Sequence, residues 1–193
     1  MKKYAVMLGV CLSLVQFSNP ARAQTAGGGS FEKGTILISP GISFGAVGYG
    51  GYVGSGSGFL PLSASLEYSL DDKFAVGPYL GFYSRKYSGS FRYSSFSFGD
   101  KGTVHATSLL NEAFDSSIDA EKIDLFASAY LGARTLSYTY DNAAFNGNYD
   151  NDFGLRLGVT IGGRYFFNPN LGVFLEVGYG AIGYSTLGVS FKL

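Results

Sequence analysis

Side chains that carry redox or metal chemistry are nearly absent from this sequence. It contains one cysteine, Cys11, one histidine, His105, and no tryptophan. Because Cys11 lies in an N-terminal segment that we expect to be removed, the mature chain offers no thiol for a disulfide bond or a thiolate-bound metal. A single histidine supplies too few ligands for an ordinary transition-metal site. We therefore expect neither a metal nor a cofactor.

Charged residues are also scarce, at 15% of the chain, and they balance, with 14 Lys and Arg against 14 Asp and Glu. This balance indicates neither nucleic acid nor another acidic partner, so we expect no nucleic-acid binding. The glycine-rich run over 48–58 lacks the Lys-Ser/Thr pair of a phosphate-binding loop and opens no helical pattern. It therefore predicts no nucleotide site.

A long apolar run occurs only at the N-terminus. Two lysines precede an apolar stretch over about 4–15, and Ala-Arg-Ala follows at 21–23. This pattern is typical of a secretory signal peptide that is cleaved before Gln24. The stretch is shorter than the roughly 20 apolar residues that a transmembrane helix needs. We expect a cleaved signal peptide over residues 1–23, a flexible N-terminal segment over 24–33 and a single domain over 34–193.

Glycine and aromatic residues are abundant instead, with 29 Gly, 17 Phe and 15 Tyr, a composition that favours β-structure. Apolar residues alternate with small or polar ones along the whole domain, which is the signature of strands. Tight turns alternate with longer segments, which indicates an up-and-down meander. We predict about eight strands, over 35–45, 59–70, 74–85, 99–110, 122–140, 153–167, 171–182 and 185–193.

The fourth of these strands has the weakest pattern. Alternation is poor over 99–110, and the following link over 111–121 is compatible with a helical turn. The segments over 46–58, 86–98 and 141–152 are expected to be long loops at one end of the meander, with the tight turns and both termini at the other end.

Alternating strands suit two environments. A soluble sandwich or barrel turns its apolar face inward, whereas an outer-membrane barrel turns it toward lipid and keeps polar residues in the lumen. Here the polar face carries mostly Gly, Ser, Thr and Tyr, which fit a narrow interior better than a wet surface. Aromatic residues gather near strand ends, as in membrane girdles. With the secretory leader, these features favour an all-β, antiparallel, up-and-down transmembrane barrel.

The charges on the polar face are the main candidate site. Side chains along a strand point alternately to its two sides, so odd and even positions lie on opposite faces. This parity predicts a lumen ion-pair network at Glu67, Arg85, Asp124, Arg134, Arg156, Arg164 and Glu176, with Lys192 on the same face. A three-residue turn over 168–170 would pair Phe167 with Leu171 and set Glu176 diagonally from Arg164. Buried charges must pair, so we expect the network to plug the barrel. The alternative is a narrow channel for small solutes.

An enzyme is a remote alternative. His105 has Ser108 three residues later and Glu112 seven residues later, the residue types of a hydrolytic triad. No spacing pattern holds these three together, and a single histidine in a polar segment is usually only solvated. We therefore expect no catalytic residues.

The C-terminal half resembles a known family. The segments KIDLFASAYLGAR, GRYFFNPNLGVFLEVGYG and LGVSFKL are similar to the small porin-family outer-membrane β-barrel proteins of the OmpA type. Val189, Phe191 and Leu193 resemble the C-terminal signal that such proteins present to the barrel assembly machinery, although the last residue is Leu where Phe is usual. The label "porin" does not imply a pore, because many members have no established activity.

The resemblance implies a location, partners and a role. The location is the outer membrane of a Gram-negative-type cell, reached after export with a cleaved signal peptide. The partners are outer-membrane lipid and lipopolysaccharide, the barrel assembly machinery and periplasmic chaperones. We expect a non-enzymatic barrel with a structural or surface-interaction role. The narrow channel and the outer-membrane lipid-modifying enzyme are the alternatives.

Overall fold

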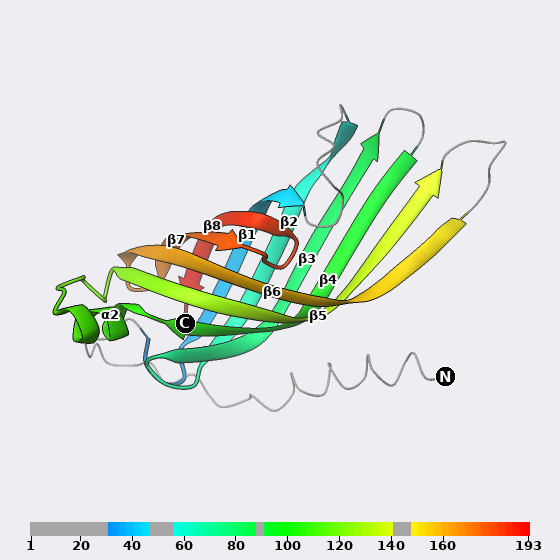
Figure 1. The fold of residues 1–193 in the computed structure, drawn as a ribbon. Coiled ribbons are helices and arrows are strands. Elements are labelled where there is room, and N and C mark those ends of the chain that lie inside the picture. The colour runs from blue at the N-terminus through cyan, green and yellow to red at the C-terminus, as the bar shows by residue number, and fades with distance from the viewer. Residues whose placement is uncertain (1–30, 47–55, 88–90, 141–147) are drawn as a thin grey trace.

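The chain forms a closed β-barrel. The computed structural model describes residues 31–46, 56–87, 91–140 and 148–193. Each strand pairs antiparallel with the next, and the last pairs with the first (Figure 1). The predicted eight-stranded up-and-down barrel is therefore confirmed. The strands are β1 (Ile36–Ala46), β2 (Gly56–Ser69), β3 (Phe74–Tyr87), β4 (Phe91–His105), β5 (Ile123–Tyr140), β6 (Asn148–Asn168), β7 (Leu171–Gly178) and β8 (Gly183–Lys192). The described residues also form the helix α2 (Thr107–Phe114).

The two ends of the barrel differ. The end that holds α2, the C-terminus and the short β2–β3 and β6–β7 connections is called the turn end here (Figure 1). Asp71 Oδ1 closes the first turn by accepting from the backbone N–H of Lys73 and of Phe74, at 2.8 and 2.7 Å. Asn168 Oδ1 closes the second in the same way. Such Asx turns are a standard use of Asp and Asn. At the opposite, far end, the strands of β3–β6 extend well beyond β7 and β8.

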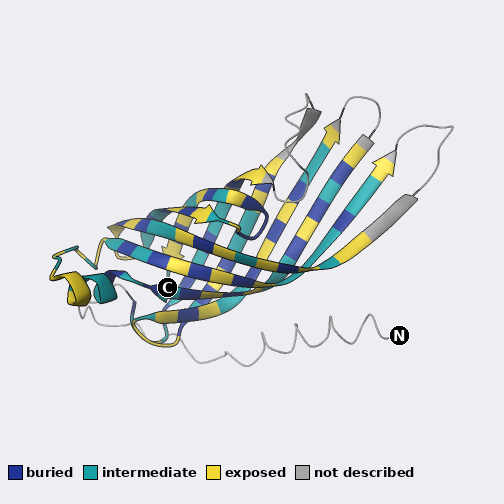
Figure 2. Cartoon of the chain, in the orientation of Figure 1, coloured by how far each residue is buried: buried dark blue, intermediate teal, exposed yellow. Residues whose placement is uncertain are grey.

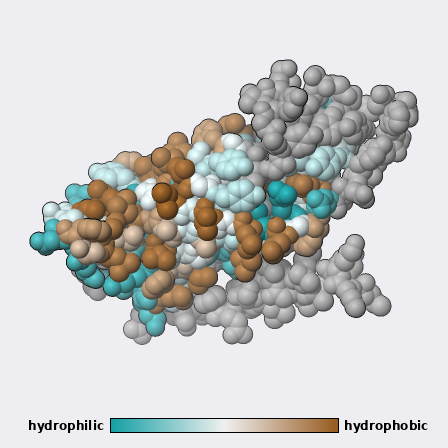
Figure 3. Space-filling model, viewed as in Figure 1, coloured by the Kyte–Doolittle hydropathy of each residue, from teal (hydrophilic) through white to brown (hydrophobic). Residues whose placement is uncertain are grey.

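Apolar side chains cover the outside of the wall, and polar ones lie inside. Along β6, Leu157 is 56% exposed and Ile161 is 69% exposed, whereas Arg156 is 2% exposed. Figure 2 shows this alternation of exposed and buried positions on the strands, and Figure 3 shows apolar residues over the wall. Asp100, exposed on β4 between Pro78 and Leu131, is an exception for which we have no physical account. The arrangement is the reverse of that in a soluble barrel.

The predicted bounds of the fourth strand are wrong. β4 covers Phe91–His105, so most of the expected loop over 86–98 is strand, and α2 occupies the end of the predicted strand and the start of the link. The alternation between apolar and polar residues is hard to see in the sequence because serines occur on both faces of β4. Ser95 is buried, whereas Ser94 forms a hydrogen bond with Ser84 on the outer face. No helix in the described part of the chain is long and apolar enough to cross a membrane.

The β6–β7 turn is shorter than predicted. Leu171 pairs with Asn168, and the register shifts between Phe166 and Asn168, so Phe167 forms an irregularity and the turn itself is Pro169-Asn170. Farther along the hairpin the register is the expected one, with Arg164 opposite Phe174. The bulge absorbs the extra residue, which keeps the inward and outward faces of both strands in place.

The first described residues are packed against the barrel. Residues 31–33 belong to the segment that we expected to be flexible, yet Phe31 is buried in a cluster with Leu37 and Phe166. Its ring stacks on the imidazole of His105, with a centroid distance of 3.8 Å and an interplanar angle of 15°. Phe31 therefore covers His105 at the turn end of the barrel. The predicted signal peptide and the rest of that segment lie outside the described residues.

Candidate functional site

Buried polar side chains lie in three layers inside the barrel, and the first layer is at the turn end. Asp124 of β5 and Arg164 of β6 are cross-strand partners, and Arg164 Nη1 donates to Asp124 Oδ2 at 2.5 Å. The other carboxylate oxygen lies 3.0 Å from His105 Nδ1. Arg164 Nε donates to Ser190 Oγ at 2.9 Å. Because every partner is buried, this layer is a closed polar cluster beneath Phe31.

The second layer is centred on Lys101 of β4. Its Nζ lies 3.3 Å from Glu67 Oε1 and 3.4 Å from Glu176 Oε2, so one ammonium bridges two carboxylates. Hydroxyl groups satisfy the remaining carboxylate oxygens. Thr103 and Ser65 donate to Glu67, while Tyr130 (2.5 Å) and Thr160 donate to Glu176. A buried ion pair is tolerated only when such extra hydrogen bonds compensate its desolvation.

The third layer is made by the β7–β8 connection, Tyr179–Ile182, which is called the inserted turn below. Its residues Gly180, Ala181 and Ile182 are buried in the lumen, whereas Tyr179 is exposed. Arg156 donates through Nη2 to the carbonyl of Gly180, and its guanidinium stacks on Tyr179 at 3.8 Å. Ser97 Oγ donates to the carbonyl of Ala181 at 2.6 Å. Ile182 packs with Tyr83, Tyr93 and Leu136 from the facing strands.

Gly178 permits the inserted turn. Its φ of +133° lies in a region that L-residues rarely adopt, and a Cβ at this position would be 2.4 Å from the carbonyl oxygen of Val159. β7 ends here, and the ring of Tyr179, which is 37% exposed, also covers the guanidinium of Arg156. Glycine is the residue that makes such a change of direction without strain.

The layers together balance their charge. Among the described residues, the buried acids are Glu67, Asp124 and Glu176, and the buried bases are Lys101, Arg156 and Arg164. Three negative groups thus face three positive ones, without counting His105. The compensation is local only for the first layer, because the second layer sets one ammonium against two carboxylates and the third layer holds an arginine without an acid. Arg156 has only a carbonyl and an aromatic ring, and its Nε and Nη1 have no hydrogen-bond partner in the described part of the chain.

The structure brings together five of the seven residues predicted for the lumen. Glu67, Asp124, Arg156, Arg164 and Glu176 are all buried. Arg85 and Arg134 are half-buried toward the far end of β3 and β5. The diagonal pair between Arg164 and Glu176 is not formed, because Arg164 binds Asp124 and Glu176 binds Lys101. Lys192 instead lies over the ring of Phe166, at 4.9 Å from its centroid.

Lys101 is the residue that sequence reasoning missed. It is fully enclosed and links two strands that are not its neighbours. Its parity matches that of Thr103 and His105, so a correct fourth strand would have placed it inside. The flanking glycines at 99 and 102 obscured that strand.

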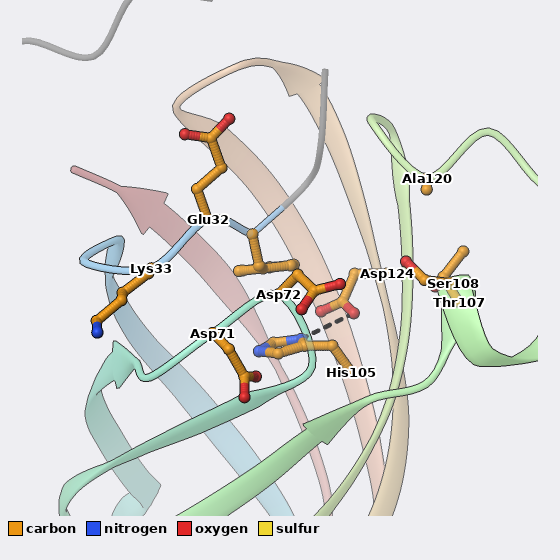
Figure 4. A pocket seen from close by; sticks show the side chains of 10 residues that line it. Glu32, Lys33, Asp71, Asp72, His105, Thr107, Ser108, Ala120 and Asp124 are labelled. Atoms are coloured by element: carbon orange, nitrogen blue, oxygen red, sulfur yellow. Dashed lines mark hydrogen bonds and ion pairs between the residues drawn. The ribbon is translucent and has the colours of Figure 1, made fainter. Parts of the chain in front are cut away.

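His105, Ser108 and Glu112 do not form a triad. His105 is 3% exposed, its Nδ1 is bound to Asp124 and its Nε2 has no partner among the described residues. Glu112 instead lies 3.8 Å from Lys73 in an exposed ion pair. Figure 4 shows Ser108 on the far side of Asp124 from the imidazole. The described residues also include no group of three or more His, Cys, Asp or Glu placed to hold a metal ion.

Two basic residues stand together on the outer face near the far end. Lys86 of β3 and Arg92 of β4 are direct cross-strand partners, and both are exposed. Next to them, Ser84 and Ser94 share a hydrogen bond of 2.8 Å. Nearer the turn end the same two strands carry Phe82 opposite Phe96, at the edge of the apolar wall.

The residues of the expected assembly signal lie at the C-terminus of β8. Val189, Phe191 and Leu193 are all exposed, and the first two belong to the outer apolar wall. Phe191 pairs with Leu171 of β7 and with Ile38 of β1. The last strand therefore presents an apolar row on the outside while it closes the barrel.

Comparison with known proteins supports the fold. No protein-family model matches the chain, and no curated protein matches its sequence. Among solved structures, Ail, the attachment invasion locus protein of Yersinia pestis, in complex with the heparin analogue sucrose octasulfate, has a TM-score of 0.55 and 14% identity over 83% of this chain and 99% of that chain.

Two further similar structures have lower scores. Neisserial surface protein A has a TM-score of 0.49 and 15% identity over 82% of this chain and 94% of that chain. The N-terminal β-barrel domain of Pseudomonas aeruginosa OprF has a TM-score of 0.47 and 16% identity over 84% and 98%. At these identities the likeness to Ail shows the fold alone. The resemblance to small outer-membrane β-barrels is confirmed at that level.

Proposed function

We propose that the protein is an integral outer-membrane β-barrel with a structural or surface-interaction role and a lumen closed to solutes. The observation that carries this proposal is the exposed apolar wall around a charged, buried interior. Soluble monomers rarely expose apolar patches larger than about 300–600 Å². A wall of this kind on most strands needs lipid, and a closed barrel satisfies its backbone groups without water.

The buried side chains inside the barrel support the proposal that the lumen is closed and that the role is other than general diffusion. Phe31 stacks over the turn-end layer, and the inserted turn fills the opposite side. Between them lies the Lys101 layer, whose side chains bond one another across the barrel. Solute passage would require several of these buried bonds to break together, at about 3–5 kcal/mol for each broken buried ion pair.

Localisation and conductance test these two parts separately. The native chain, expressed with its leader, should fractionate with the outer membrane and begin at Gln24 by N-terminal sequencing. It should also migrate differently on a gel with and without boiling. The purified barrel should be silent in planar bilayers. A freely soluble periplasmic product would disprove the membrane proposal, whereas regular conductance steps would favour the narrow channel.

The surface-interaction role has a specific candidate in Lys86 and Arg92. We infer that this pair binds phosphate or sulfate groups on a saccharide, because two adjacent cations above an apolar wall match an anionic group at the membrane surface. The structure of Ail contains a heparin analogue, sucrose octasulfate. For this chain the proposal is supported by its own residues, with Ser84 and Ser94 as further hydrogen-bonding groups.

A binding experiment distinguishes lipopolysaccharide from a free glycan. The Lys86→Gln/Arg92→Gln variant should lose most binding to lipopolysaccharide-containing vesicles in low salt, and a matched Lys33→Gln/Lys122→Gln variant should not. Binding to immobilised sulfated glycan but not to these vesicles would identify a soluble glycan. Equal binding by both variants would contradict a role for the pair.

The barrel assembly machinery and periplasmic chaperones are the other proposed partners. We propose that Val189, Phe191 and Leu193 are read by the barrel assembly machinery after delivery by periplasmic chaperones, since they form an apolar row on the last strand. A Phe191→Ser variant should accumulate unassembled in the periplasm, whereas Tyr184→Ser on the same strand should assemble. The lipid-modifying enzyme gains no support from geometry, because Ser108 forms no hydrogen bond with His105 in the described structure.

A further inference from the structure

A cavity at the turn end borders the first lumen layer, with His105 and Asp124 in its lining. It has a volume of about 520 Å³, which is within the range of small-molecule pockets. Phe31, His105 and Asp124 form its inner wall, while the β2–β3 turn contributes Asp71 and Asp72 (Figure 4). Glu32 and Lys33 from the segment before β1 complete one side. The proposed function uses none of these groups on a ligand.

The hydrogen-bond partners of His105 determine its tautomer. Asp124 accepts from Arg164 with one oxygen and lies 3.0 Å from His105 Nδ1 with the other. A carboxylate that is bound to a guanidinium acts as an acceptor only, so the proton must be on Nδ1. Nε2 of the neutral ring is then a bare acceptor. It is buried and has no partner in the described part of the chain, and Figure 4 shows it on the side of the ring away from Asp124, toward Asp71.

The other cavity groups are acceptors too. Asp71 uses only Oδ1 in its turn, and Asp72 forms no hydrogen bond or ion pair with a described residue. With Glu32, these carboxylates outnumber the one lining ammonium, that of Lys33, and Asp124 is already paired with Arg164. Lys192 is outside the lining and lies 5.8 Å from the centroid of the Phe31 ring, and even with its charge the carboxylates of Glu32, Asp71 and Asp72 remain in excess. A cavity with unpaired acceptors and excess negative charge selects a cation that donates hydrogen bonds.

We propose that this cavity binds the primary ammonium group of a small aliphatic amine. An ammonium donates three hydrogen bonds and carries the complementary charge. His105 Nε2 and the Asp71 and Asp72 carboxylates are its acceptors, and the ring of Phe31 provides an apolar surface for the carbon chain. A metal ion fits less well, because the described residues include no group of three or more ligands placed to hold one.

Histidine NMR gives a direct test, because the chain has a single histidine. The full mature chain, labelled with ¹⁵N-histidine and prepared in mildly alkaline detergent buffer without a polyhistidine tag, should show a protonated Nδ1 and an unprotonated Nε2. Addition of cadaverine should shift the Nε2 resonance saturably, and pentanol should not. The opposite tautomer, or no shift with cadaverine, would overturn the proposal.

Variants locate the site independently of His105. Asp72→Asn lies in an exposed turn and should weaken cadaverine binding about fivefold, whereas His105→Phe should weaken it roughly tenfold or more. Glu112→Gln, on the same rim but outside the cavity lining, should bind as the unaltered chain does. Unchanged binding by Asp72→Asn would reject the cavity as the site. Displacement of cadaverine by a lower concentration of Zn²⁺ or Ca²⁺ would overturn the ligand class in favour of a metal.

Discussion

Lys101 of β4 and Glu67 of β2 meet inside the barrel with 3.3 Å between Nζ and Oε1, although β3 lies between their strands. The same ammonium reaches Glu176 of β7 on the other side of the lumen at 3.4 Å. One side chain of the fourth strand thus connects the two halves of the sheet. The interior is consequently held by contacts between strands that are not neighbours.

Removal of the Lys101 charge should destabilise the barrel strongly. Lys101→Met keeps much of the side-chain volume but leaves two buried carboxylates without a cation, at a cost of about 3–5 kcal/mol in the free energy of unfolding. Equilibrium urea unfolding in detergent micelles would measure the change. Lys86→Met, at an exposed position, is the matched control and should stay within about 0.5 kcal/mol of the original value.

The effects of changing Glu67 and Lys101 on the free energy of unfolding should not be additive. Glu67→Gln combined with Lys101→Met removes one of the two stranded charges, so the double variant should be more stable than the sum of the single changes predicts. A double-mutant cycle on the same urea curves gives this coupling. Simple additivity would show that Glu67 and Lys101 do not stabilise each other.

A side chain at Gly178 should prevent the inserted turn from forming. Gly178→Val places a β-branched residue at a φ of +133° and a Cβ 2.4 Å from a backbone oxygen, so we expect a loss of at least about 2 kcal/mol. Gly154→Val is a matched control because a Cβ there has open space. Equal effects of the two changes on unfolding would contradict a special role for Gly178.

A charge on the outer wall should be costly only if lipid surrounds it. Leu157→Arg should reduce folding stability in phospholipid bilayers by about 2–4 kcal/mol. Thr139→Arg, exposed on β5 nearer the far end, should cost about 0–1 kcal/mol. If Leu157 faced water, Leu157→Arg would be nearly neutral and would improve solubility, an outcome that refolding yields would show at once.

Phe31 should contribute to stability despite its position before the first strand. Phe31→Ala removes the ring that stacks on His105 and contacts Phe166, with an expected loss of about 3 kcal/mol. Lys33→Ala, at an exposed position two residues later, should have little effect. If the segment before β1 were only a flexible leader to the barrel, both changes would leave the urea midpoint where it is.

Much of the fold could be read from local pattern. Period-two alternation located seven strands, since the residue types on the two faces differ clearly on each of them. Two ends were misplaced, because β6 begins at Asn148 where 153 was predicted and β7 ends at Gly178 where 182 was predicted. It failed at β4, where serine occurs on both faces and Gly99 and Gly102 interrupt the apolar row. A Cβ at Gly99 would be 2.2 Å from the carbonyl oxygen of Leu131, so close strand contact explains one of these interruptions. The requirement for glycine at position 99 comes from the contact with β5, so it cannot be recognised from the sequence of β4 alone.

The candidate site, like the fold, could be predicted only in part from the sequence. Parity alone assigned Glu67, Asp124, Arg156, Arg164 and Glu176 to the inner face, because the side chains of a strand point alternately to its two sides. Parity could not predict which of these residues form ion pairs with one another. Pairing depends on the stagger of the closed sheet, which set Arg164 against Asp124 and left Glu176 to the unpredicted Lys101. The unpartnered Nε2 of His105 likewise follows from Phe31 and Asp124, which are distant in sequence.

The sequence by itself determined which residues lie on the outer wall and which face the lumen, since that choice depends on period and residue type along each strand. Only the tertiary structure decided which charges meet, how the inserted turn closes the far side and where a cavity remains at the turn end. Each of these depends on closure of eight staggered strands, and closure relates residues across the barrel that no local spacing connects.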